Sequence, residues 1–388
     1  MANWCFLLLL IGFSSQAVEL MLWHQKEEAK LWLPNVAKEY EEKTGVKINV
    51  AFLPTGELKT TLVRSVIDGT APAMALVPSD FIGDRGKLQL STVDASLLSS
   101  AQTSESLATV MFDENYYGVP LQGGNHLLLF YNKKFVQQPA ATWQQLITQA
   151  KALREINVQP IGWKYGEMYW FCAFIPPFGG FPVADNRVTL DTQAVRDALT
   201  FYRNLSREGL IDPNCDYDCS FDRFKNGEFA YAINGDWAFK ETASALGDDF
   251  GITLLPTING KPIQPMYGTL SLVYPGYSLN SPAAEAIKGF SSYLQSPEMQ
   301  QRYYDDLGAL PVNEQIVAKI KSSASPEMQI LLKQLELARG APPTPAMSAA
   351  WLGMRKGFAL FIDGHGSAEE ATALMQRFSE HELQKNSQ

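Results

Sequence analysis

The chain has 388 residues, a length typical of two or three domains. Lys and Arg number 32 against 41 Asp and Glu, which gives a formal net charge of −9 at pH 7. A chain this acidic lacks the basic surface that a phosphate backbone requires, which excludes nucleic-acid binding. The hydrophobic share of 46% is that of a globular chain, neither disordered nor membrane-spanning.

Residues 1–17 have the pattern of a secretory signal. Their apolar run, residues 4–13, is too short to span a bilayer, and the small residues Ser15 and Ala17 follow it at the positions that precede a cleavage site. No Lys or Arg precedes the run. We therefore predict a signal peptide over residues 1–17 and a soluble, exported mature protein.

Export changes the meaning of the cysteines, because an exported protein can form disulfides. Cys172 lies in an apolar stretch and is expected to be a buried thiol. Cys215 and Cys219 lie four residues apart in a polar segment, close enough to bridge, and a disulfide there is an alternative to two free thiols. The polar residues around them alternate as in a calcium loop, but Tyr217 and Arg223 stand where Gly and Glu are required, which favours a polar turn.

Strands and helices alternate in the N-terminal region. Val46, Ile48, Val50 and Phe52 alternate with more polar residues as in a half-buried strand, and Gly45 ends the helix before it. This order of elements predicts a parallel, doubly wound sheet. The expected elements are a strand at 19–23, a helix at 27–43, a strand at 46–52, a helix at 58–67 and a strand at 73–77.

The middle of the chain repeats the alternation and predicts a second α/β lobe. Thr142 and Gln145 form a capping box at the start of one of its helices. The expected elements are strands at 127–131, 229–233, 252–255 and 270–273 and helices at 142–154 and 191–209. The remainder is expected to be helical, over 283–294, 297–307, 326–339, 347–362 and a last helix opened by Ser367 and Glu370.

Catalytic and metal-binding motifs are not found in the sequence. The histidines are scattered, and neither an HExxH pair, a GxSxG elbow nor a glycine-rich phosphate loop occurs. We therefore expect no enzyme activity, no metal and no cofactor. A glycosidase carboxylate pair cannot be singled out by spacing in an acidic chain, so a secreted glycosidase remains an alternative.

Aromatic and polar residues gather at the ends of the expected elements. Trp237 directly follows the strand end Asn234-Gly235, and Trp351 lies one helical turn before Arg355. Core packing is the alternative for each tryptophan taken singly. Together they favour a saccharide site, because a sugar offers an apolar face to a ring and an edge of hydroxyls to polar groups. The residues that suggest such a site are Glu167, Tyr169, Trp170, Trp237, Trp351 and Arg355.

Four motifs carry a resemblance to a known family: AINGDWA at 232–238, MSAAW at 347–351, TGVK at 44–47 and FYNK at 130–133. The chain resembles the family 1 extracellular solute-binding proteins of ABC importers and is most similar to the maltose- and maltodextrin-binding members. The resemblance implies the type II periplasmic-binding-protein fold, with two α/β lobes, three hinge crossings and a ligand held between the lobes. It implies an N-terminal lobe of residues 18–124 plus 272–320 and a C-terminal lobe of 125–271 plus 321–388.

The resemblance also implies a set of ligand-binding residues. Trp237 and Trp351 match the two main sugar platforms of the family, and Tyr169 with Glu167 matches its stacking and polar pair. Asp80 matches a carboxylate that binds hydroxyls. Arg355 matches an arginine that reaches an outer sugar unit.

The first-lobe side of the expected site departs from the maltose binders. Glu27-Glu28 stands in place of an Asp-Lys pair, and Asn125 stands in place of a Glu. Val77, Phe81 and Leu352 replace a Trp, an Arg and a Tyr. The platforms are therefore kept while the groups that contact hydroxyls are changed, and we expect further hydrogen bonds to the ligand from Asn125, Glu27 and His24.

The resemblance implies a monomeric periplasmic protein that captures a saccharide without chemistry and delivers it to an ABC permease in the inner membrane. A di- or oligosaccharide similar to maltodextrin is the expected ligand. The main alternative is a binder of another solute, such as a glycerophosphodiester or a polyamine. A phosphate ligand would need basic partners, and Arg355 is the one basic residue among the matched positions.

Overall fold

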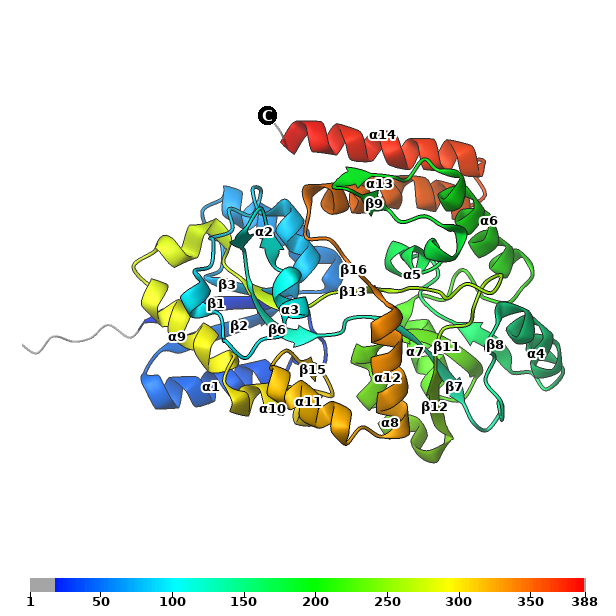
Figure 1. The fold of residues 1–388 in the computed structure, drawn as a ribbon, viewed down its shortest axis with the longest axis horizontal. Coiled ribbons are helices and arrows are strands. Elements are labelled where there is room, and N and C mark those ends of the chain that lie inside the picture. Colours follow the sequence, from blue (N-terminus) through cyan, green and yellow to red (C-terminus); the bar gives the residue numbers. More distant parts are fainter. Residues whose placement is uncertain (1–17, 387–388) are drawn as a thin grey trace, which may run out of the picture.

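The computed structural model describes residues 18–386, which form two α/β lobes side by side (Figure 1). The first lobe surrounds a six-stranded sheet of order β15-β6-β14-β3-β1-β2, and the second surrounds a four-stranded sheet of order β12-β7-β11-β8. The predicted signal peptide lies outside the described residues. Within residues 18–386, no helix has both the length and the apolar character needed to cross a membrane.

The sheet of the first lobe contains strands of both directions. β1 pairs in parallel with β2 and β3, as predicted, whereas β14 is antiparallel to β3 and β6. β14 arrives from the other lobe rather than through a local helical crossover, so it is not constrained to be parallel. The main elements are β1 (Glu19–His24), α1 (Trp32–Thr44), β2 (Lys47–Phe52), α2 (Thr55–Ile67), β3 (Met74–Pro78), β6 (Val119–Gly123), β14 (Leu270–Val273), α9 (Ala284–Leu294), α10 (Pro297–Leu307) and β15 (Leu310–Pro311).

Helix α1 begins at Trp32, later than the start predicted at residue 27. Residues 27–31 form a turn between β1 and the helix. The helix buries Leu33, Val36 and Tyr40 against the sheet and ends, as predicted, at Gly45, whose φ of 75° is left-handed. The turn matters for function because it carries Glu28 toward the second lobe.

The second lobe is built around β11, which is buried along its whole length. β11 is parallel to β8 and antiparallel to β7, so this sheet is also mixed. The predicted capping box of Thr142 and Gln145 opens α4. The main elements are β7 (Leu127–Asn132), α4 (Trp143–Glu155), β8 (Gln159–Gly162), α5 (Met168–Cys172), α6 (Gln193–Arg207), α7 (Tyr217–Lys225), β11 (Phe229–Gly235), α8 (Phe239–Leu246) and β12 (Phe250–Thr253).

The chain passes between the sheets at three places. It leaves the first sheet between β6 and β7, returns between β12 and β14, and leaves again after β15. Beyond β15, Ile316 of α11 (Glu314–Ser322) and Leu331 of α12 (Pro326–Leu337) join the core beneath the four-stranded sheet. The division of the chain at residues 124, 271 and 320 stays a prediction.

The polar segment around the cysteines, predicted as a polar turn, leads directly into a helix, α7 (Tyr217–Lys225). Cys215 and Cys219 form a disulfide, and Cys219 lies in the first turn of α7. Asp216 caps this helix by accepting a hydrogen bond from the Cys219 N–H at 3.0 Å. The acidic residues therefore serve the turn and the helix start. Cys172 is a buried free thiol, which confirms that prediction.

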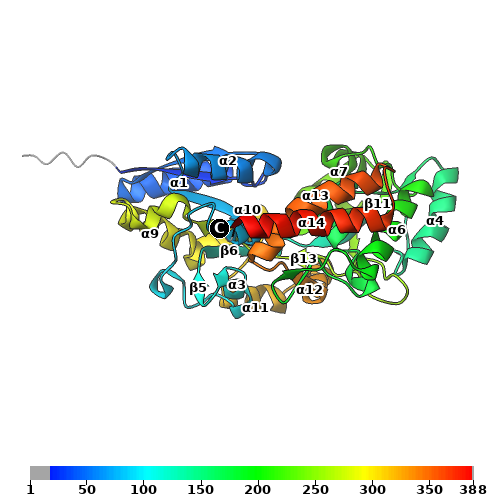
Figure 2. The ribbon, with the colours of Figure 1, turned by 90° about the horizontal axis from the view of Figure 1, so that it is seen from above.

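The last two helices, α13 (Pro345–Ile362) and α14 (Ala368–Asn386), pack closely along one side of the second lobe and reach toward the first (Figure 2). A Cβ added at Gly353 would overlap the Ser379 hydroxyl and the Met375 carbonyl of α14. The absence of a side chain at Gly353 is therefore what allows the two helices to approach so closely.

We expect Gly353→Ala to lower the free energy of unfolding by about 1–3 kcal/mol, because backbone on α14 has to move. Gly56→Ala is the matched control: Gly56 is in α2 and has no heavy atom near its added Cβ, so its stability should be unchanged or slightly higher. Urea denaturation of both variants measures the difference. Equal midpoints for the two would show that α13 and α14 tolerate separation.

Candidate functional site

Three aromatic side chains from distant segments meet between the lobes. Tyr169 lies in α5, Trp237 in the 3₁₀ helix after β11, and Trp351 in the first half of α13. The Tyr169 ring stacks on Trp351 with centroids 6.4 Å apart and lies 6.2 Å from the Trp237 ring. All three are only partly buried. The structure thus brings together the three predicted stacking residues as one aromatic surface.

Trp237 is held in place by two neighbours. Its indole N–H donates to the Tyr217 hydroxyl at 3.0 Å, and the edge of Trp170 packs against its ring at 6.2 Å. Trp170 itself is 5% exposed and donates its N–H to the Ile233 carbonyl at 2.8 Å. Trp170, predicted to bind ligand, therefore supports Trp237 from behind, because its ring is buried and its polar atom is already bonded.

The hydroxyl of Tyr169 ties α5 to the crossing segments. It donates to the carbonyl of Asn125 and, at 3.2 Å, to the carbonyl of Met266. Asn125 has a left-handed φ of 50°, and its N–H donates to Asp236 Oδ2 at 2.9 Å. Burial raises the pKa of Tyr169 well above its usual value, so the hydroxyl remains a neutral donor. Asn125 thus lies at the site and contacts Tyr169 through its backbone, and its hydrogen bond to the ligand stays a prediction.

Asp80 lies on the first-lobe side, in the 3₁₀ helix η1 (Ser79–Asp84). Burial raises the pKa of its carboxyl, while Lys59 and the nearby Trp351 indole N–H act in the opposite direction. Asp84, at the other end of η1, is 2.7 Å from Lys59 Nζ and accepts a hydrogen bond from Ser348 of α13. This network fixes η1 against α13, so Asp80 and Trp351 are held close to each other.

An open cavity of about 700 Å³ lies between the lobes beside Trp237. A smaller and less open cavity adjoins it at the base of the cleft, with room for about one water-sized group. The larger cavity is lined by Glu28, Lys225, Asn226, Trp237, Lys240, Glu241, Ser244, Ala245, Asp306 and Leu307. The smaller is lined by Lys26, Glu28, Gln122, Gly123, Asn125, Asp236, Trp237, Leu270, Leu307 and Ala309.

The remaining predicted site residues are not all at these cavities. Glu167 precedes the first residue of α5 and pairs with Lys164 at 3.2 Å, close in sequence to Tyr169. Arg355 is exposed on α13, one turn after Trp351. Glu27 is exposed and pairs with Lys30 at 3.2 Å, so the structure places Glu28 rather than Glu27 at the cavities.

His24 is fully buried at the end of β1, edge-on to Phe52 at 5.5 Å, and lines neither cavity. Burial lowers its pKa to about 4, so the ring is neutral at pH 7. We interpret His24 as a core histidine of the first lobe rather than as the ligand contact predicted from its position.

Several residues in or next to the site were not predicted. Asp236 lies within the AINGDWA motif and accepts the N–H of Asn125. Tyr217 lies between the two cysteines, whose spacing allows a disulfide but gives no sign of a role for the tyrosine. Gln122 is a polar residue in an otherwise apolar strand, a signal that could have marked it. Within residues 18–386, no three His, Cys, Asp or Glu side chains are grouped so that they could hold a metal ion.

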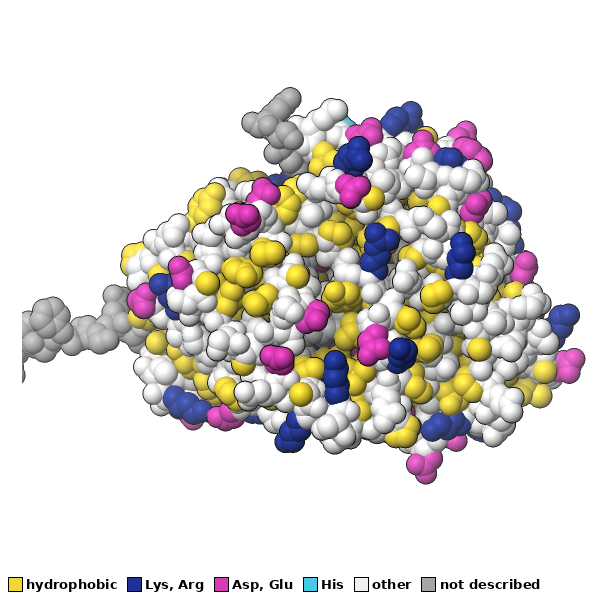
Figure 3. Space-filling view, viewed as in Figure 1, with side chains coloured by type: hydrophobic (Ala, Val, Ile, Leu, Met, Phe, Trp, Pro, Cys, Tyr) yellow, Lys and Arg dark blue, Asp and Glu magenta, His cyan; other side chains and the backbone are white. Residues whose placement is uncertain are grey.

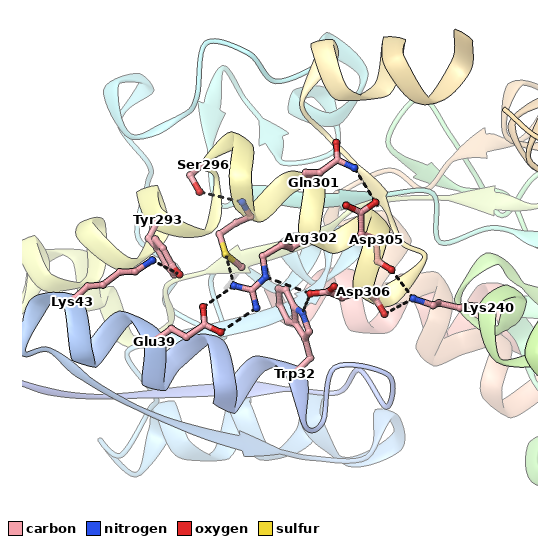
Figure 4. Close-up of polar contacts among 11 residues, drawn as sticks. Trp32, Glu39, Lys43, Lys240, Tyr293, Ser296, Gln301, Arg302, Asp305 and Asp306 are labelled. Carbon is pink, nitrogen blue, oxygen red and sulfur yellow. Dashed lines mark hydrogen bonds and ion pairs between the residues drawn. The ribbon is translucent and has the colours of Figure 1, made fainter. Parts of the chain in front are cut away.

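Lys240 joins the lobes at the edge of the larger cavity (Figure 4). Its Nζ extends from α8 and donates to the carbonyls of Asp305 at 2.6 Å and Asp306 at 2.8 Å, at the C-terminal end of α10. A cation is favoured at a helix C-terminus because the last carbonyls lack partners within the helix. Over the face seen in Figure 3, basic and acidic side chains are interspersed.

The model of the bacterial extracellular solute-binding protein family matches residues 35–330, which is most of the chain. The chain belongs to this family. A maltotriose-binding protein of Pyrococcus abyssi is 24% identical over 95% of this chain and 83% of its own length. A maltooligosaccharide ABC transporter solute-binding lipoprotein of Streptococcus pneumoniae is 26% identical over 87% of this chain and 82% of its own length.

Solved structures include a similar fold. The maltose/maltodextrin-binding domain of Bdellovibrio bacteriovorus bound to maltotriose superimposes with a TM-score of 0.88 at 26% identity, covering 95% of this chain and all of that one. The predicted periplasmic-binding-protein fold is therefore confirmed. Membership in an extracellular solute-binding family also confirms the prediction of a binding protein and sets aside the glycosidase alternative.

Proposed function

We propose that this solute-binding protein captures a maltooligosaccharide between its lobes and presents it to an ABC permease in the inner membrane. In this proposal the protein acts as a periplasmic monomer from which residues 1–17 have been removed. The observation that carries the proposal is the aromatic surface of Tyr169, Trp237 and Trp351, of which Trp237 lines the interlobe cavity. The named ligands of the similar proteins point to the same class of sugar.

The site chemistry fits a neutral sugar. The partly exposed rings offer apolar surface to pyranose faces, and Glu28, Asn125 and Asp236 surround the base of the cleft with groups that bond hydroxyls. Closure of the lobes removes water from these groups, which strengthens each hydrogen bond to the ligand. Asp80, Glu167 and Arg355 would contact sugar units farther along the aromatic surface.

The same cavities fit a phosphate-containing solute less well. The basic side chains that line them are all engaged: Lys26 with Glu28 at 2.7 Å, Lys225 with Glu241 at 2.6 Å, and Lys240 with the end of α10. A phosphodiester would have to displace one of these partners, and the carboxylates nearby would repel it.

Saturating maltotriose should raise the stability of the protein. At a concentration one hundred times the Kd, binding adds about 2.7 kcal/mol, which for a chain of this size raises the Tm by about 3–4 °C. Differential scanning fluorimetry with a panel of maltooligosaccharides, cellobiose and a glycerophosphodiester measures this directly. A shift with the glycerophosphodiester alone, or with no sugar in the panel, would contradict the proposal.

A further inference from the structure

Gln122 is a buried polar side chain without a partner. It lies near the end of β6, the last strand before the chain crosses to the second lobe, and is 2% exposed. Neither its amide nitrogen nor its amide oxygen makes a hydrogen bond with any described residue. A primary amide can donate two hydrogen bonds and accept two, and leaving such a group buried and unbonded is costly.

A neighbouring glutamine shows what a structural amide looks like in this lobe. Gln300 is 1% exposed, and its nitrogen donates to the Leu121 carbonyl at 3.0 Å. Its oxygen accepts the N–H groups of Val312 at 2.9 Å and Asn313 at 3.2 Å. Gln300 therefore joins α10 to two other backbone segments, at Leu121 and at residues 312–313. Gln122 directly follows Leu121 in β6, and its amide bonds to none of the residues that the structure describes.

Gln122 lines the smaller cavity at the base of the cleft. Around that cavity, Lys26 pairs with Glu28 at 2.7 Å, and Asp236 accepts a hydrogen bond from the Asn125 N–H at 2.9 Å. Trp237, one ring of the aromatic surface, also borders it. The cavity thus combines a stacking ring with the buried, unbonded amide of Gln122, in a space that suits a single hydroxyl.

We infer that Gln122 binds a hydroxyl of the captured saccharide at the closed end of the cleft. This inference rests on the proposed function and adds to it a residue that determines specificity. The amide oxygen of Gln122 accepts the proton of this one hydroxyl, because the smaller cavity has room for a single such group. The carboxylates of Glu28 and Asp236 beside it favour such a neutral group over an anion.

The test is Gln122→Leu, which keeps similar volume and removes the amide. Because an unbonded buried amide is replaced by an apolar group, the ligand-free variant should melt about 1–3 °C above the wild-type protein. Its Kd for maltotriose, measured by isothermal titration calorimetry, should rise at least about 10-fold, because a sugar hydroxyl is then buried without a partner. Gln300→Leu is the matched control, and it should lower the Tm while leaving the Kd within about 2-fold of wild type.

The two readouts separate ligand binding from a structural role. A lower Tm with an unchanged Kd would show that Gln122 has a structural role and would overturn the inference, as would a higher Tm with an unchanged Kd. Should Gln122→Leu fail to fold, Gln122→Met replaces it in the same two measurements. If the wild-type protein bound no saccharide of the panel, the proposed function would fail, and the inference with it, before any variant was compared.

Discussion

Trp237→Ala should raise the Kd for maltotriose by about 30- to 100-fold, equivalent to about 2–2.7 kcal/mol. Trp237 is the one aromatic residue that borders both interlobe cavities, and Tyr217 and Trp170 hold its ring in place. Truncation therefore removes a preorganised stacking surface at the centre of the site rather than a mobile contact at its rim. Isothermal titration calorimetry of wild-type protein and variant gives the ratio.

Two further variants make the Trp237 result specific. Trp237→Phe keeps a ring but loses the hydrogen bond to Tyr217, so its affinity should lie between those of wild type and Trp237→Ala. Tyr293→Ala removes a partly buried aromatic ring from α9 of the first lobe and should reduce stability without changing the Kd. Wild-type affinity in Trp237→Ala would mean that the saccharide binds elsewhere on the protein.

His24 should make the protein less stable as the pH falls from 7 toward 4. Its pKa is about 4 in the folded state against about 6.5 when unfolded, so between these values the unfolded chain binds the proton and the native protein does not. Stability is fully present above pH 6.5 and declines as the pH passes through this window, by up to about 3 kcal/mol from this residue.

The variant His24→Leu should remove that part of the acid response. Urea midpoints measured between pH 7.5 and 4.5 should decline less steeply in His24→Leu than in the wild-type protein. His365→Leu, at an exposed position near the end of α13, is the matched control and should retain the wild-type slope. Parallel slopes for wild type and His24→Leu would show that this histidine is accessible to protons in the native state.

Local patterns in the sequence predicted much of the secondary structure. The alternation of Val46, Ile48, Val50 and Phe52 marks β2, and the Thr142 capping box marks the start of α4, because both depend on residues close together in the chain. The predicted start of α1 was wrong, and α7 was not predicted. Leu31 and Tyr217 fit a local helical or loop pattern equally well, and contacts with other segments decide between the two.

The sequence by itself determined the two α/β lobes, the kind of binding protein and the three aromatic residues that we expect to stack on a sugar. Only the tertiary structure decided how each polar residue near them is used, because that depends on partners far away in the chain. Glu28 faces the second lobe while Glu27 pairs with Lys30 at the surface. Among the described residues, Gln300 bonds to four backbone groups and the amide of Gln122 bonds to none, although both are buried glutamines in the same lobe.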